Sequence, residues 1–182
     1  MQLHRGARWA LIVMVLLTLG FGEALAGSQQ TDTITVAVTI AESIEMVPWP
    51  GGLLQLSAAA VPDQAVISPP VSLKVRANAP WGLEIRSNMS DGRMKEFDKT
   101  AAAYVSGGAM LTNPLQWSTS PGGPWNDLSG DASSIVSSQP PTGKDGKDVV
   151  FYLRLEPDYE DLPLPEGRDY RIMLQYTAGL SY

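Results

Sequence analysis

The fold class of this chain is decided by residues 71–87, which read VSLKVRANAPWGLEIRS. Apolar residues alternate with polar ones from Val71 to Val75 and again from Trp81 to Ile85. Because successive side chains of a β-strand point to opposite faces of a sheet, this period of two predicts two half-buried strands. The residues between them, Asn78-Ala79-Pro80, are typical of a turn, so we expect the two strands to form an antiparallel hairpin.

Similar runs recur on both sides of this stretch, separated by glycine and proline. They are Asp32–Ile40, Ile44–Val47, Leu53–Leu56, Leu115–Trp117, Val149–Glu156 and Tyr170–Tyr182. Stretches with helical spacing are scarce, which argues against parallel strands linked by helices. We therefore expect an all-β protein, an antiparallel β-sandwich of about seven to nine strands.

Residues 88–112 interrupt the alternation. Met94, Phe97, Ala101 and Tyr104 recur at helical spacing, whereas Gly107-Gly108 indicates a turn between two short apolar pairs. A short helix followed by a hairpin fits both signals. We expect an irregular insertion here, within a single domain that spans residues 27–182.

Residues 1–26 predict a secretory signal peptide. Arg5 and Arg8 precede an apolar run from Trp9 to Phe21, and Ala24-Leu25-Ala26 fits the small-residue pattern of a cleavage site. The apolar run is shorter than the ~20 residues that a helix needs to cross a bilayer. We expect an exported protein that resides in the periplasm, at the cell surface or in the extracellular medium.

Composition narrows the range of partners. The chain has 13 Lys and Arg against 19 Asp and Glu, a formal net charge of −6. Nucleic acids and anionic lipids are bound through basic residues, so neither nucleic acid nor stable membrane insertion is expected. The chain contains no cysteine, and without disulfides the fold must be stabilised by a hydrophobic core.

Residues suited to catalysis are scarce. His4, the single histidine, lies in the predicted signal peptide, so the remaining chain lacks the groups for histidine triads, thiol catalysis and the usual zinc sites. Asp158, Glu160 and Asp161 form the densest acidic cluster, but a Pro-rich turn gives no groove for paired-carboxylate chemistry. The acidic loops also match no calcium-loop spacing. We expect no enzymatic activity, no cofactor and no metal.

Two sets of residues are candidates for binding. Trp49, Trp125 and Tyr159 lie in predicted loops, where aromatic faces stack on sugar rings unless they fold back over the ends of the sandwich. Trp81 and Trp117 are expected in the core. The second set comprises the alternating apolar residues of the first predicted strand, Ile34, Val36, Val38 and Ile40. That strand either adds to the sheet of a neighbouring molecule or pairs within its own domain.

Two resemblances to known families bear on the fold and the function. Leu164 to Tyr170, followed by an alternating strand, resembles the tyrosine-corner entry of immunoglobulin-like and fibronectin-type sandwiches. This resemblance implies that the Tyr170 hydroxyl bonds back to the preceding arch. The strand Thr33–Ile40, together with Gly167, Tyr170 and Tyr182, resembles secreted pilin-like subunits of the spore-coat-U type, although the cysteines that such subunits often pair are missing here.

Together these features predict a non-enzymatic protein with a structural or adhesive role at the cell surface, such as a fibre or pilin-like subunit. Its partner would be another protein or a second copy of the chain. The first alternative is a carbohydrate-binding module that uses the loop aromatics. The second is a small outer-membrane β-barrel, because Leu174–Tyr182 alternates and ends on an aromatic residue.

Overall fold

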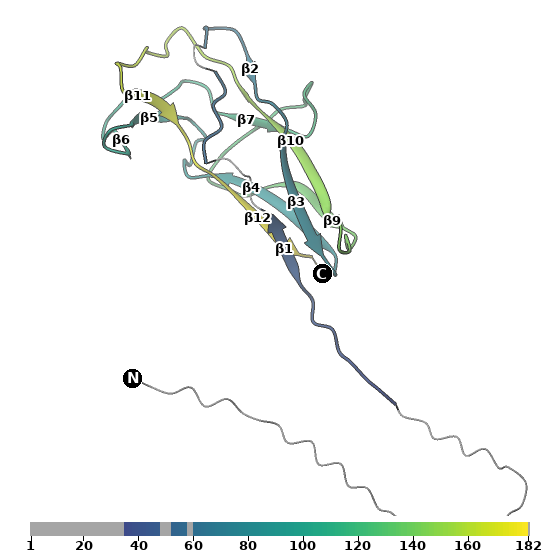
Figure 1. Ribbon diagram of the computed structural model, residues 1–182. Helices are drawn as coiled ribbons and strands as arrows, with labels where there is room; N and C mark the ends of the chain where they lie inside the picture. Colours follow the sequence, from purple (N-terminus) through teal and green to yellow (C-terminus); the bar gives the residue numbers. More distant parts are fainter. Residues whose placement is uncertain (1–34, 48–51, 58–59, 182) are drawn as a thin grey trace, which may run out of the picture. The chain divides into compact units, whose positions relative to one another are not determined.

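The computed structural model describes residues 35–47, 52–57 and 60–181. The chain divides into two units, residues 1–39 and residues 40–182. In the first unit, described residues 35–39 carry no secondary structure. The predicted signal peptide, residues 1–26, lies outside the described residues. The second unit is all-β with antiparallel pairing throughout its described part, as predicted (Figure 1).

Twelve strands form three sheets in the described residues. Their bounds are β1 Ile44–Val47, β2 Val66–Ile67, β3 Val71–Ala77, β4 Trp81–Ser87, β5 Lys95–Asp98, β6 Ala103–Tyr104, β7 Gln116–Ser118, β8 Asn126–Asp127, β9 Ser133–Gln139, β10 Lys147–Leu155, β11 Arg168–Arg171 and β12 Leu174–Leu180. The large sheet has the order β1-β3-β10-β7-β8, with β2 also paired to β10. The second sheet has the order β12-β4-β9, and the third, the accessory sheet, has the order β11-β5-β6.

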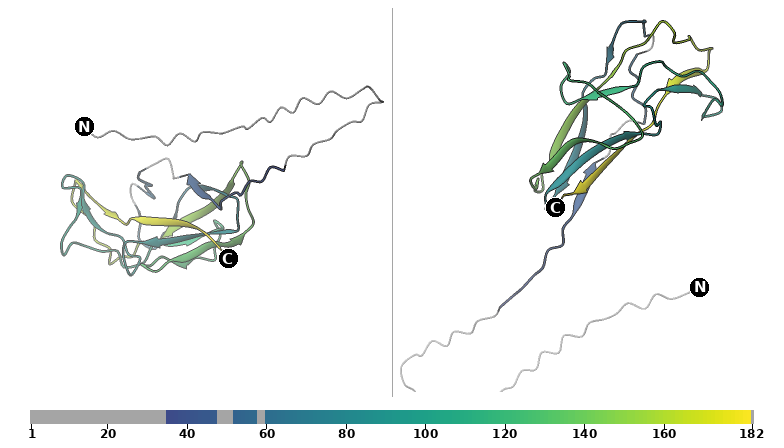
Figure 2. Two further views of the ribbon diagram at one scale, coloured as in Figure 1. Left: turned by 90° about the horizontal axis from the view of Figure 1, so that it is seen from below. Right: turned by 180° about the vertical axis from the view of Figure 1, so that it is seen from behind.

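The two larger sheets share one hydrophobic core. The inward side chains of β3 and β4 are buried in strict alternation along each strand, and those of β10 follow the same rule from Val149. Trp81, Ile85 and Phe151 are completely buried. The core collects side chains from both sheets, which gives the unit a sandwich-like architecture (Figure 2). Trp81 and Trp117 lie in this core, as predicted.

The predicted hairpin between β3 and β4 is wrong, although both strands are present. β3 pairs with β1 and β10, whereas β4 pairs with β12 and β9, so the connection passes from one sheet to the other. Ala79, in the turn between them, is buried. Charged residues of β3 consequently meet neighbours other than β4: Lys74 lies 3.8 Å from Asp148, and Arg76 lies 3.3 Å from Glu45.

Of the helix and hairpin signals within residues 88–112, the helix is not formed, and this segment contains the hairpin β5–β6. Phe97 and Tyr104, which suggested a helical face, are cross-strand neighbours with ring centroids 5.4 Å apart. Asp98 shapes the turn, since its carboxylate accepts hydrogen bonds from the backbone of Thr100 and Ala101 at 2.8 and 2.9 Å. β11 completes the accessory sheet at one end of the unit (Figures 1 and 2).

The last predicted strand, Tyr170–Tyr182, is divided between two sheets. β11 pairs with β5 and β12 pairs with β4, and the break lies at Ile172 and Met173. Asn88 holds Met173 there: its backbone N–H donates to the Met173 carbonyl at 2.9 Å, and its side-chain oxygen accepts from the Met173 N–H at 2.8 Å. The tyrosine-corner bond is present, with the Tyr170 hydroxyl 2.8 Å from the Leu162 carbonyl, but it leads into the accessory sheet.

Other differences from the expected strands lie in weakly patterned segments. Leu54 and Leu56 pack against the core without forming a strand. β9 was not expected, because its sequence SSIVSSQ is mostly polar, and only Ile135 is fully buried. The strand count exceeds seven to nine because β2, β6 and β8 have only two residues each. In the described residues, no helix has the length and apolar character required to cross a membrane.

Replacing Leu83 with alanine should destabilise the protein by about 2–5 kcal/mol, because the substitution leaves a cavity at the centre of the core. Denaturant-induced unfolding followed by tryptophan fluorescence measures the change. Glu84→Ala on the same strand is the control, since Glu84 is exposed and its loss should change the free energy of unfolding by less than about 0.5 kcal/mol. Equal losses in the two variants would contradict this core assignment.

The accessory sheet should loosen in acid. Glu96 is buried, and a hydrogen bond from the Ala109 backbone N–H, together with the Arg168 guanidinium, lowers its pKa below the usual 4.5. A carboxyl group with a lowered folded-state pKa contributes stability that is fully present above its usual pKa and is lost as pH falls through the folded-state value. The protection factors of β5 and β11 amides, measured by hydrogen exchange and corrected for the intrinsic rate at each pH, should therefore fall below about pH 4.5.

Glu96→Gln should reduce that pH dependence, because the amide cannot gain the proton. Asp145→Asn, at an exposed turn residue, is the control and should leave the dependence unchanged. Equal acid sensitivity in the Glu96→Gln variant and the unmodified chain would refute the role of Glu96.

Candidate interaction surface

The loop aromatics do not assemble into one platform in the described residues. Trp125 is half-buried, and the Arg154 guanidinium carbon lies 5.8 Å from its ring centroid, so one face of the indole is occupied. Tyr159 is 77% exposed in the loop that follows β10, and its ring contacts no other described aromatic ring. Trp49 lies outside the described residues. The structure therefore supplies one covered and one isolated aromatic ring.

The acidic cluster has a local structural use. The two carboxylate oxygens of Asp161 accept hydrogen bonds from the backbone N–H groups of Thr112 at 2.7 Å and Asp158 at 2.8 Å, and the Asp158 carboxylate accepts one from Glu160 at 2.9 Å. These bonds shape the turn and tie it to the segment that precedes β7. Within the described residues, no three His, Cys, Asp or Glu side chains converge as metal ligands do.

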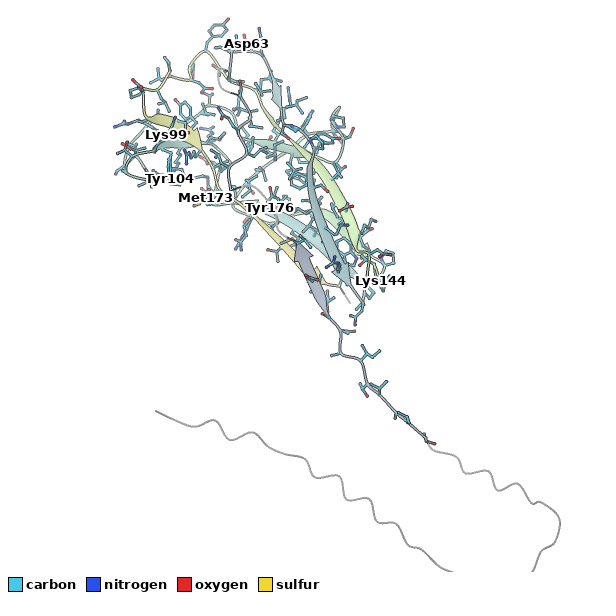
Figure 3. The ribbon with its side chains drawn as sticks, in the orientation of Figure 1. Asp63, Lys99, Tyr104, Lys144, Met173 and Tyr176 are labelled. Carbon is cyan, nitrogen blue, oxygen red and sulfur yellow. The ribbon has the colours of Figure 1, made fainter. Side chains whose placement is uncertain are left out.

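Two hollows lie near the accessory sheet. One, of about 320 Å³, is bordered by Arg86, Asn88 and Met173 where β4 and β12 meet the accessory sheet. The other, of about 420 Å³, is bordered by Lys95, Tyr104 and Met110. In Figure 3, Tyr104 and Lys99 lie at this end of the unit and Lys144 lies at the opposite end. Apart from Tyr104, the ionisable lining of the first hollow is Arg86 and that of the second is Lys95. One such side chain in a hollow does not supply the paired acid and base of acid–base catalysis.

The alternating N-terminal segment is extended chain that forms no strand. Residues 35–40 carry no secondary structure, so the strand predicted over Asp32–Ile40 is not formed in its described part. Val36, Val38 and Ile40 are 87, 85 and 79% exposed. Ile34, the fourth member of the row, lies outside the described residues. Three apolar side chains at spacing two are thus left in contact with water.

β12 has a free edge and an incompletely covered apolar row. It pairs with β4 on one side, and on its other side it forms no strand pairing with any described residue. The row of inward side chains on β12 is half-buried, whereas the inward residues of β4 are fully buried. The row consists of Leu174, Tyr176, Ala178 and Leu180. This difference is expected where one flank of a strand has no hydrogen-bonded neighbour.

Tyr176 anchors the middle of this row (Figure 3). Its ring lies 5.4 Å from that of Phe151, centroid to centroid, and burial raises the pKa of its hydroxyl to about 12. The neighbouring edge strand of the large sheet is β1, whose inward residues Ile44 and Met46 are also half-buried. β1 lies beside β12, yet no backbone hydrogen bonds join the two strands in the described residues.

The exposed segment and the free edge match in chemistry and spacing. Side chains on one face of a strand recur about every 7 Å, so an apolar row at spacing two can register with another such row. A free edge offers the backbone N–H and C=O groups that a new strand needs. Sequence alternation identified Val36, Val38 and Ile40, but the sequence contains no signal that β12 lies at an edge.

No protein-family model matches the chain, and no curated protein or solved structure matches it significantly.

Proposed function

We propose that this chain is an exported, non-enzymatic subunit of a surface assembly, and that its N-terminal segment adds as a β-strand to another molecule. The observation that supports this most directly is the exposure of Val36, Val38 and Ile40 at alternating positions. Burying a valine or isoleucine side chain contributes roughly 1.5–3 kcal/mol. Covering this row would therefore favour association, against the cost of ordering the segment.

The acceptor in this proposal is the free edge of β12. Strand addition combines main-chain hydrogen bonds, which give affinity, with contacts of alternate side chains, which give specificity. β12 meets both requirements: its edge is unpaired in the described residues, and it presents the half-buried row centred on Tyr176. Because one chain carries both the donor segment and the acceptor edge, a second copy is the simplest partner. Repeated head-to-tail addition would then build a fibre.

Two further features support this function. The sandwich-like architecture is common to immunoglobulin-like modules, and we assign the fold to that type, with the accessory sheet as an elaboration. The predicted signal peptide supports a location in the periplasm, at the surface or outside the cell, where assemblies of pilin-like subunits form. Sugar binding has weaker support, because Arg154 lies over one face of Trp125 and the Tyr159 ring contacts no other described aromatic ring.

The proposal predicts that assembly depends on one face of the N-terminal segment. The exported chain should form concentration-dependent oligomers, and combined Val36→Asp, Val38→Asp and Ile40→Asp substitutions should leave a folded monomer. Size-exclusion chromatography with light scattering measures the mass, and circular dichroism checks the fold. The physical reason is that three carboxylates cannot be buried against the apolar row of β12 without a large desolvation cost.

The matched control places the same charge on the opposite face. Combined Thr35→Asp, Ala37→Asp and Thr39→Asp substitutions add three carboxylates that would stay in solvent, so oligomers should persist. A monomeric unmodified chain at high concentration would contradict the proposal. Equal loss of assembly in both triple variants would show that charge alone, and not the apolar face, is responsible.

A further inference from the structure

Asn78 connects the turn after β3 to the chain that precedes β1. The β1–β3 ladder ends at the pair Ile44 and Ala77, and the Asn78 N–H extends it by donating to the Ser43 carbonyl at 3.2 Å. The Asn78 side chain then continues the pattern. Its oxygen accepts from the Ser43 N–H at 2.7 Å, and its nitrogen donates to the Ala41 carbonyl at 2.9 Å.

The side chain of Asn78 takes the place of further backbone in β3. The chain does not continue that ladder itself, because it bends at Asn78 and Ala79 and Pro80 has no N–H. An asparagine side chain carries both a donor and an acceptor, as a peptide group does. It therefore holds Ala41 and Ser43 in the line of β1, as far as three residues before Ile44, the last paired residue of that strand.

This contact bears on where the donated segment can go. The segment ends at Ile40 and β1 begins at Ile44, so residues 41–43 are the link at which the segment would turn toward the β12 edge of its own molecule. Asn78 holds backbone groups of two of these three residues, Ala41 and Ser43. Pairing with a second copy requires no reversal and keeps all three bonds.

We infer that Asn78 is a positioning residue, which keeps the chain at Ala41–Ser43 in line with β1 and so directs the N-terminal segment to a second copy rather than to its own β12 edge. The inference rests on the proposed function, since it concerns the choice between two acceptors of the same segment. The hydrogen bonds of Asn78 go to Ala41 and Ser43, which belong neither to β12 nor to the apolar row of the donor segment.

The absence of cysteine from the chain allows a direct test by disulfide cross-linking. Ala37→Cys places a thiol in the middle of the donor segment, and Thr177→Cys places one in the middle of β12. Both positions are exposed, and central positions meet whichever way the added strand runs. Isotope-labelled and unlabelled protein are mixed and then oxidised. Mass spectrometry of the 37–177 linked peptide then distinguishes disulfides within one copy from disulfides between copies. Mixed-label peptides mark bonds between copies, and single-label peptides in excess mark bonds within one copy.

The cross-link should form mainly between copies when Asn78 is present. Asn78→Ala should raise the ratio of links within a copy to links between copies about tenfold, because two exposed hydrogen bonds, each favouring the extended line by roughly threefold, are lost. Asn78→Asp retains the acceptor for Ser43 but not the donor for Ala41, and should give an intermediate ratio. Asn126→Ala, on the distant edge strand β8, should leave the ratio unchanged.

The possible failures are separable. The first failure is a ratio of links within a copy to links between copies that is the same in the Asn78 and Asn78→Ala proteins. That result would overturn the role of Asn78, while strand addition at β12 would stand. Links mainly within one copy in the Asn78 protein would also overturn it. If folded protein gives no 37–177 link in any variant, strand addition at this edge fails, and the inference fails with it. Circular dichroism and thermal unfolding of each variant establish that the protein is folded.

Discussion

The apolar layer between the two larger sheets is the constraint on which the rest of this structure depends. β3 and β10 line one side and β4 lines the other, and their inward side chains are fully buried around Trp81 and Phe151. With no disulfide available, this layer must supply most of the stability. It also dictates that each of these strands keeps one face inward, because a shift in register by one residue would expose the whole row.

The same layer explains why β12 and β1 are incompletely covered. Each strand lies at the edge of its sheet, so it has a hydrogen-bonded neighbouring strand on one flank only. An edge of this kind is a hazard for uncontrolled association unless something protects or uses it. In our proposal the N-terminal segment of another copy uses it, and Asn78 holds Ala41 and Ser43 in line with β1. The incomplete cover of β12 thus follows from the position of this strand at the margin of the core, and the exposed row of the N-terminal segment supplies apolar side chains to cover it.

The accessory sheet is stabilised differently. Its strands are short, and its centre is the buried carboxylate of Glu96, paired with Arg168 and hydrogen-bonded to the Ala109 backbone. Arg171 lies over the Phe97 ring, 4.2 Å from its centroid, and is also paired with Asp169. A buried carboxylate requires this degree of pairing, because an unpaired charge away from water is strongly destabilising. The sheet is therefore specified by polar contacts that carry no simple periodic signal.

What the sequence determined by itself was local. Alternation located β3, β4, β10 and β12 and assigned their buried faces, since the period of two follows from backbone geometry, and it also marked Val36, Val38 and Ile40. Only the tertiary structure decided which strands pair with each other. β3 and β4 lie in different sheets, and β11 and β12 lie in different sheets although one alternating stretch of sequence contains both. The structure also decided that β12 is an edge strand. The physical reason is that strand pairing joins residues distant in sequence, and an alternating strand has the same pattern whichever sheet it enters. Asn78 illustrates the limit of prediction from sequence. The stretch Asn78-Ala79-Pro80 predicted only a turn, whereas the side-chain hydrogen bonds of Asn78 join it to Ala41 and Ser43, 35 or more positions away in the chain.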